Sequence, residues 1–136
     1  VIGQIHAAKD EPARLYYQKF PGSRRGSIYV AHEPSGGDDI FIDLLGSKSS
    51  TPNDPPAGIA LDEKFTYEIQ AKGNLLTVTI SRDGEVLARE TIDMSNSGYD
   101  VADDFMYFKA GVYNQNLSGD PDDYVQATFY ELENIH

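Results

Sequence analysis

Tight turns between short two-sided segments place the strongest constraint on how this chain folds. Asp83-Gly84 separates residues 75–82 from residues 85–93, and hydrophobic residues recur in both segments. An Asp-Gly pair in that setting predicts a hairpin, because a two-residue primed turn needs positive φ at both central residues. Lys72-Gly73-Asn74 predicts another turn, which adds residues 65–71 as a third strand. No helical periodicity persists over ten residues, so we expect an all-β chain.

The remaining segments extend this pattern along the whole sequence. Further strands are predicted over residues 2–9, 14–20, 27–32, 39–45, 107–115 and 124–132. Residues 46–60 are rich in Pro, Ser and Gly and form a long irregular stretch, which is either a cleft wall or lid or a tolerated excursion. The prediction is an antiparallel β-sandwich with one hydrophobic core.

Two of the predicted strands carry hydrogen-bonding and titratable side chains on one face. The period of two residues places Gln4 and His6 on one face of the first strand. On the strand over residues 107–115 the same rule aligns Tyr107, Lys109, Tyr113 and Gln115. The opposite faces of both strands are apolar, as docking on a core requires. An imidazole, phenols, an ammonium and amides on one sheet face predict an active site for an anionic substrate.

The charge distribution narrows the choice of partner. The net charge is −11 and the sequence pI is about 4.5, which argues against a nucleic acid. Residues 1–30 nevertheless hold five basic and two acidic residues, net +3, and the rest of the chain is net −14. These basic residues either line one cleft that attracts a polyanion or are scattered solvated charges.

Several other classes of protein are excluded by the composition. The chain has no cysteine, so disulfides and thiolate chemistry are excluded, although this does not decide the compartment. No run of 18 apolar residues is present, so no membrane-spanning helix is expected. No zinc or nucleotide motif is present, and we expect no metal and no cofactor. The Asp120-Pro121-Asp122-Asp123 cluster fits a solvated turn better than a calcium loop.

The segments Gln4-Ile5-His6 and 107–115 (YFKAGVYNQ) resemble two of the three signature motifs of the alginate lyases of polysaccharide lyase family seven. The nine-residue match is specific, whereas the tripeptide alone would be weak. The resemblance implies a β-jelly roll, a secreted or periplasmic location, and cleavage of the 1,4-glycosidic bond of a poly-uronate by β-elimination. The Gln-Ile-His form resembles the members that accept guluronate-containing stretches.

The resemblance also implies a role for each candidate residue. Gln4 neutralises the substrate carboxylate, while His6 and Tyr113 transfer protons. Tyr113 protonates the departing oxygen and also serves as base for mannuronate, whereas His6 is the base for guluronate. A phenol acts as base at neutral pH only beside a cation, and Lys109 is the candidate for that cation. Substrate contacts are expected from Lys109, Gln115, Tyr107 and Arg14.

One departure from the family pattern concerns the third motif. An Arg-x-Glu-Leu-Arg strand is expected before Gln4-Ile5-His6, and Arg24-Arg25 does not replace it. We therefore expect residues 1–136 to be the C-terminal portion of a single catalytic domain, with the arginine strand either on a second chain or in a segment left out before residue 1. On that view residues 1–136 alone are poorly soluble and inactive. Otherwise Lys9, Arg14 or Lys109 must neutralise the carboxylate.

Two alternative functions remain open. A non-catalytic carbohydrate-binding module would use Tyr16, Tyr17, Tyr107 and Tyr113 as stacking platforms. A jelly-roll glycoside hydrolase would need two carboxylic acids that flank the scissile bond, and Glu131 and Glu133 are a weak match for such a pair. Only the lyase needs a histidine and a tyrosine with matched proton-transfer roles.

Overall fold

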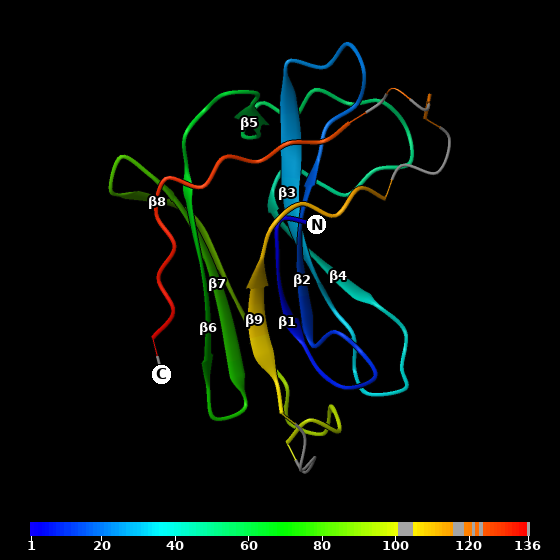
Figure 1. Ribbon diagram of the computed structural model, residues 1–136, viewed down its shortest axis with the longest axis vertical. Coiled ribbons are helices and arrows are strands. Elements are labelled where there is room, and N and C mark those ends of the chain that lie inside the picture. Colours follow the sequence, from blue (N-terminus) through cyan, green and yellow to red (C-terminus); the bar gives the residue numbers. More distant parts are fainter. Residues whose placement is uncertain (101–104, 116–118, 121, 123, 136) are drawn as a thin grey trace.

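Two antiparallel sheets make up the computed structural model, which describes residues 1–100, 105–115, 119–120, 122 and 124–135. The larger sheet has the strand order β4-β3-β2-β1-β9, with β5 paired to β3, and the smaller has the order β6-β7-β8. The strands are β1 (Gly3–His6), β2 (Ala13–Gln18), β3 (Arg25–His32), β4 (Ile40–Leu45), β5 (Ile59–Ala60), β6 (Thr66–Lys72), β7 (Leu75–Arg82), β8 (Glu85–Asp93) and β9 (Tyr107–Ala110). Figure 1 shows the smaller sheet beside the larger one, with β9 at the near edge of the latter.

The predicted all-β antiparallel sandwich is confirmed, and its hairpin turn forms as the sequence indicates. Asp83 and Gly84 have φ values of 52° and 83°, which is the positive φ that a primed turn needs at both positions. β7 and β8 begin and end where the sequence predicts. This agreement follows from local chemistry, because a turn of this type fixes the register of both flanking strands.

The core lies between the two sheets and explains their alternating patterns. Leu15, Ile28 and Val30 point inward from the larger sheet, and Val78 and Ile80 point inward from the smaller one, all fully buried. Alternate residues of the larger sheet therefore point to its other face, away from the core. The side chains predicted to do chemistry lie on this outer face.

Tyr67 fixes β1 to the smaller sheet. Its phenol donates a hydrogen bond to the Ile2 carbonyl oxygen at 2.9 Å, and its ring lies against the backbone of Gly3. A Cβ at Gly3 would lie 2.9 Å from a ring carbon of Tyr67, closer than such atoms pack. The position of β1, and thus of Gln4 and His6, depends on this close approach.

Gly3→Ala is therefore expected to lower the free energy of unfolding by about 1 to 3 kcal/mol, because the added methyl forces the Tyr67 ring or β1 to move. Gly111→Ala is the matched control, because a Cβ there meets no atom within 4 Å. Urea unfolding of both variants measures the difference. Equal stability of the two variants would show that the Tyr67 ring moves aside for the added methyl without any loss of folding free energy.

Two strand predictions need correction. The segment over residues 107–115 is a strand only as far as Ala110, and the chain bends at Gly111. The predicted last strand over residues 124–132 is wrong, because the structure assigns no strand there. That segment pairs with no sheet edge among the described strands and runs past β6 (Figure 1). Tyr130 remains 73% exposed, and the Lys64 ammonium, just before β6, lies 4.0 Å from its ring centroid.

The long irregular stretch over residues 46–60 is anchored to the larger sheet. The Gln18 side chain accepts from the Ser49 backbone N–H at 3.0 Å and donates to the Ser49 carbonyl oxygen at 2.9 Å. The Asp54 carboxylate accepts from the Arg24 side chain at 2.8 Å. Lys48 lies 4.0 Å from the centroid of Phe41, which belongs to the outer face of β4. These contacts hold the stretch against the larger sheet, and its role as a cleft wall stays a prediction.

Candidate active site

A row of polar side chains crosses three neighbouring strands on the outer face of the larger sheet. Gln4 on β1 is paired with Arg14 on β2 and with Lys109 on β9. Residues directly opposite one another in antiparallel strands point to the same face, with Cβ atoms about 4.5 to 5.5 Å apart. Gln4 therefore lies on this face between Arg14 and Lys109, whose ammonium is 5.0 Å from the ring centroid of Tyr107. An amide beside cationic side chains is suited to a carboxylate ligand.

His6 lies on the same face as Gln4, one strand period further along β1. Its Nδ1 is 3.2 Å from Oε1 of Glu11, and both side chains are a little under one-third exposed. The ring of Tyr107, the partner of His6 on β9, meets the imidazole edge-on, with centroids 5.3 Å apart. His6 is thus held on two sides while part of its ring remains accessible to a ligand.

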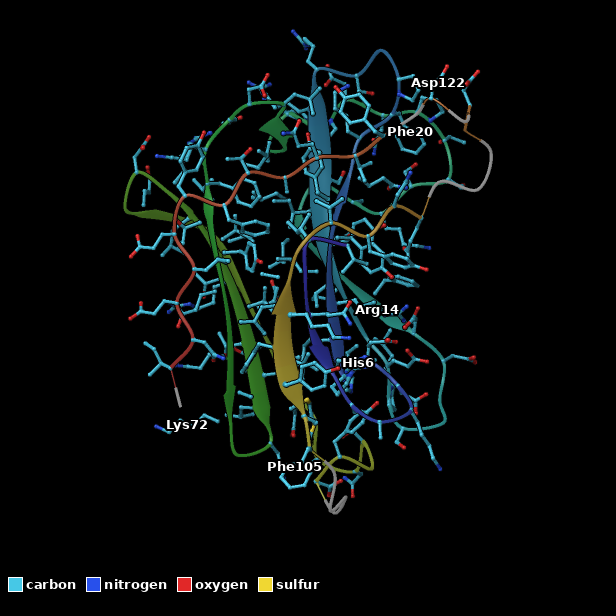
Figure 2. The ribbon with its side chains drawn as sticks, in the orientation of Figure 1. His6, Arg14, Phe20, Lys72, Phe105 and Asp122 are labelled. Carbon is cyan, nitrogen blue, oxygen red and sulfur yellow. The ribbon has the colours of Figure 1, made fainter. Side chains whose placement is uncertain are left out.

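Arg14 is already engaged by two carboxylates. Its Nη2 donates to Oε2 of Glu33 at 3.0 Å and also to Oδ1 of Asp39. Figure 2 shows Arg14 beside His6, on the adjacent strand. Burial raises the pKa of Glu33, and the Arg14 guanidinium opposes that rise. The positive charge of Arg14 is balanced within the protein, which leaves Lys109 as the better placed cation for a substrate carboxylate.

Two stacked tyrosines extend the outer face beyond Arg14. The rings of Tyr16 and Tyr29 are 4.9 Å apart at an interplanar angle of 10°, and both residues are buried. Burial raises the pKa of Tyr16 and raises that of Tyr29 to about 12, so both phenols remain protonated at neutral pH. Neither can act as a base, and Tyr16 is too buried to be a stacking platform. The side chain of Gln115 hydrogen-bonds to the Tyr16 phenol, which places Gln115 at this part of the face.

Tyr113 lies at the opposite end of β1 from His6. The backbone N–H of Tyr113 donates to the Val1 carbonyl at 3.0 Å, and the Val1 amino group donates to the Tyr113 carbonyl at 3.0 Å. Five residues, or about 16 Å of extended chain, separate Val1 from His6. Tyr113 is 64% exposed. The phenol and the imidazole can act on one bond only if both side chains extend toward a sugar that lies between them.

An irregularity at Gly111 separates Tyr113 from the regular part of β9. Continuing the pairing of Gly3 with Ala110 would place Val112 opposite Val1, yet Tyr113 makes those hydrogen bonds. Val1 packs against the stacked tyrosines of the outer face, so its hydrogen-bonded partner Tyr113 lies at that face as well. The predicted uninterrupted strand over residues 107–115 therefore does not hold, although Tyr113 returns to the face that carries Tyr107.

Sequence reasoning missed the acidic residues of the site. Glu11, Glu33 and Asp39 lie on the turns that follow β1 and β3, where they contact His6 and Arg14. One signal in the sequence could have indicated Glu11. It lies in a short turn between two predicted strands, and such a turn brings its residues back to the end of β1, close to His6. Within the part of the chain that the structure describes, no group of three or more His, Cys, Asp or Glu side chains could hold a metal ion. The described residues also include no helix long and apolar enough to cross a membrane.

Comparison with known proteins gives consistent matches. A model of a family described as alginate lyase matches residues 1–136. A curated alginate lyase from Klebsiella pneumoniae is 52% identical over 145 residues, covering 100% of this chain and 47% of the relative. The crystal structure of the alginate lyase from the same organism matches with a TM-score of 0.84 and 50% identity, over 90% of this chain and 46% of that one.

A more distant structure has the same architecture. An exolytic alginate lyase of polysaccharide lyase family seven from Zobellia galactanivorans matches with a TM-score of 0.67 and 27% identity, over 85% of this chain and 51% of that one. This chain therefore spans about half the length of the relatives it matches. Its fold is the jelly-roll β-sandwich of those proteins.

Proposed function

Because the chain belongs to the alginate lyase family, we propose that the protein cleaves alginate by β-elimination on the outer face of the larger sheet. The observation that carries this proposal is the position of Gln4 between Lys109 and Arg14, with His6 on the same face. A uronate carboxylate bound at Gln4 and Lys109 would place its sugar ring beside the imidazole. Guluronate-containing stretches are the proposed substrate, and the protein is proposed to act outside the cytoplasm.

The chemistry requires charge stabilisation as well as a base. The C5 proton is alpha to the carboxylate and only weakly acidic, so the negative charge that develops on the carboxylate must be neutralised as the proton leaves. Gln4 supplies amide donors and Lys109 a positive charge at that point. Preorganised donors of this kind cost no reorganisation during the reaction, which makes them the largest contribution in many enzymes.

The proton and electron movements of the elimination give His6 and Tyr113 separate roles. For guluronate, His6 takes the C5 proton from the face opposite to the leaving group. The C–H electron pair forms the C4–C5 double bond, the C4–O bond breaks with its electrons on oxygen, and the Tyr113 phenol protonates that oxygen. For mannuronate, the proton and the leaving group share one face, so Tyr113 would serve as both base and acid. A second chain that carries an Arg-x-Glu-Leu-Arg strand stays a prediction.

The proposal is tested by following ultraviolet absorbance of the unsaturated product with three polymers. Polyguluronate should give rising absorbance. Alginate whose carboxylates have been reduced to alcohols should give none, because it lacks the group that Gln4 and Lys109 bind and that acidifies C5. A neutral glucan serves as the negative control. Cleavage of the reduced polymer at the rate of the native one would contradict carboxylate recognition.

Replacing Gln4 tests the row more directly. Gln4→Leu keeps the side-chain volume but removes the amide, so we expect kcat for polyguluronate to fall by about 10²- to 10³-fold, as for loss of one preorganised donor. Gln70→Leu, on the outer face of the smaller sheet, is the matched control. Similar kcat values for the two variants would show that Gln4 takes no part in the reaction.

A further inference from the structure

The turn between β1 and β2 folds back so that the carboxylate of Glu11 contacts the imidazole of His6. Oε1 of Glu11 is 3.2 Å from Nδ1 of His6, and the two side chains are 29% and 28% exposed. An ionised carboxylate can only accept hydrogen bonds. In this contact, therefore, the proton of a neutral His6 ring resides on Nδ1, and Nε2 retains its free electron pair.

Both neighbours of Glu11 in the sequence are fixed by hydrogen bonds. The Asp10 carbonyl accepts from the Ala7 N–H at 3.0 Å, and the Asp10 carboxylate accepts from the Gly36 N–H at 3.1 Å. On the other side, the Pro12 carbonyl is 2.7 Å from Nδ1 of His32, which is 3% exposed. Because a carbonyl only accepts, that ring nitrogen of His32 donates. Glu11 thus projects from a turn whose backbone is held on both sides.

The ring of Tyr107 limits the remaining freedom of His6. Its edge-on contact, at 5.3 Å between centroids, lies on the β9 side, whereas Glu11 approaches from the turn. A 180° flip of the imidazole would keep this aromatic contact but would place Cδ2 opposite Glu11 and lose the hydrogen bond. Tyr107 thus fixes the plane of the ring, and Glu11 selects the orientation and the tautomer that present Nδ1–H to its carboxylate.

We propose that Glu11 is a positioning residue that holds His6 with Nδ1–H toward the turn and Nε2 free to take the C5 proton of a guluronate. This inference rests on the proposed function for the role of Nε2, but the tautomer itself does not depend on it. A carboxylate behind a histidine fixes tautomer and orientation and stabilises the cation that forms when the ring accepts a proton. Glu11 would do so without touching the substrate.

The tautomer can be measured directly by nitrogen-15 NMR of the purified protein at a pH where the imidazole is neutral. In the wild type, we expect His6 to carry its proton on Nδ1. Glu11→Ala should lose this preference, and Glu11→Gln should retain part of it because the amide keeps an acceptor oxygen. The same tautomer in the wild type and in Glu11→Ala, or a wild-type proton on Nε2, would overturn the inference.

Kinetics on polyguluronate provide the second readout. Glu11→Ala should lower kcat by about tenfold or more, since general-base catalysis depends on the correct protonation state, and should leave KM within about twofold. Glu11→Gln should lose less. Glu85→Gln, an exposed carboxylate at the β7–β8 turn, removes the same charge and should match the wild type. A kcat for Glu11→Ala equal to that of Glu85→Gln would also overturn the inference.

These readouts separate the inference from the proposed function. If the wild type does not cleave alginate, even when co-expressed with a segment that bears Arg-x-Glu-Leu-Arg, the proposed function fails, and the tautomer comparison alone decides whether Glu11 orients His6. If the wild type cleaves alginate and the tautomer does not respond to Glu11→Ala, the proposed function stands and the positioning role is wrong.

Discussion

His6→Ala is expected to lower kcat for polyguluronate by about 10²- to 10⁴-fold, the usual contribution of a general base. Polymannuronate should lose much less. The reason is stereochemical, because the C5 proton of guluronate lies opposite to the leaving oxygen and needs a base of its own. In mannuronate both groups lie on one face, and Tyr113 can serve both steps.

The measurement compares kcat on the two polymers for the wild type, His6→Ala and the control Lys72→Ala. Lys72 is at the end of β6, away from His6 and Arg14 (Figure 2). Thermal melts of each variant show whether the fold is intact. Equal losses of kcat on the two polymers in a folded His6→Ala protein would show that His6 is not the base for guluronate alone.

Tyr113→Phe should lower turnover on both polymers by at least about 100-fold, because it deletes the hydroxyl that protonates the departing oxygen. Binding of alginate should stay within a few-fold of the wild type, since the ring remains and a group that acts only in the transition state contributes little to the ground state. Retention of more than about a tenth of the wild-type rate would reject Tyr113 as the acid.

Tyr130→Phe is the matched control for this variant. Tyr130 is 73% exposed and contacts Lys64 through its ring, which the substitution keeps. Single-turnover kinetics should separate binding from cleavage for both variants. Because Tyr113 lies at the opposite end of β1 from His6, this experiment also tests whether one sugar can reach both side chains.

The sequence predicted best where one local rule decides the structure. The Asp83-Gly84 turn needs positive φ at two adjacent residues, and the strands on either side follow from it. Alternation placed Gln4, His6 and Lys109 on one face of the larger sheet, and the strand pairing brings them together. These features depend on residues close together in the sequence, or on the period of two that every strand shares.

The predictions failed where structure depends on distant partners or on a single irregular residue. Residues 124–132 have the composition of a strand, but strand formation also requires a neighbouring edge, which composition does not reveal. The bend at Gly111 interrupts an otherwise regular alternation and changes where Tyr113 lies. The contacts of Glu11 with His6 and of Asp39 with Arg14 arise only once turns fold back, so no motif indicated them.

The most direct test of the central claim is the mass of the products formed from polyguluronate. Elimination leaves a double bond at the new non-reducing end, so each new fragment should be lighter by one water than the corresponding hydrolysis product, and its appearance should parallel the rise in ultraviolet absorbance. Fragments with the full mass of hydrolysis products would contradict β-elimination. Binding of polyguluronate without any cleavage, also when residues 1–136 are co-expressed with a segment that bears Arg-x-Glu-Leu-Arg, would instead indicate a carbohydrate-binding module and would contradict the account as a whole.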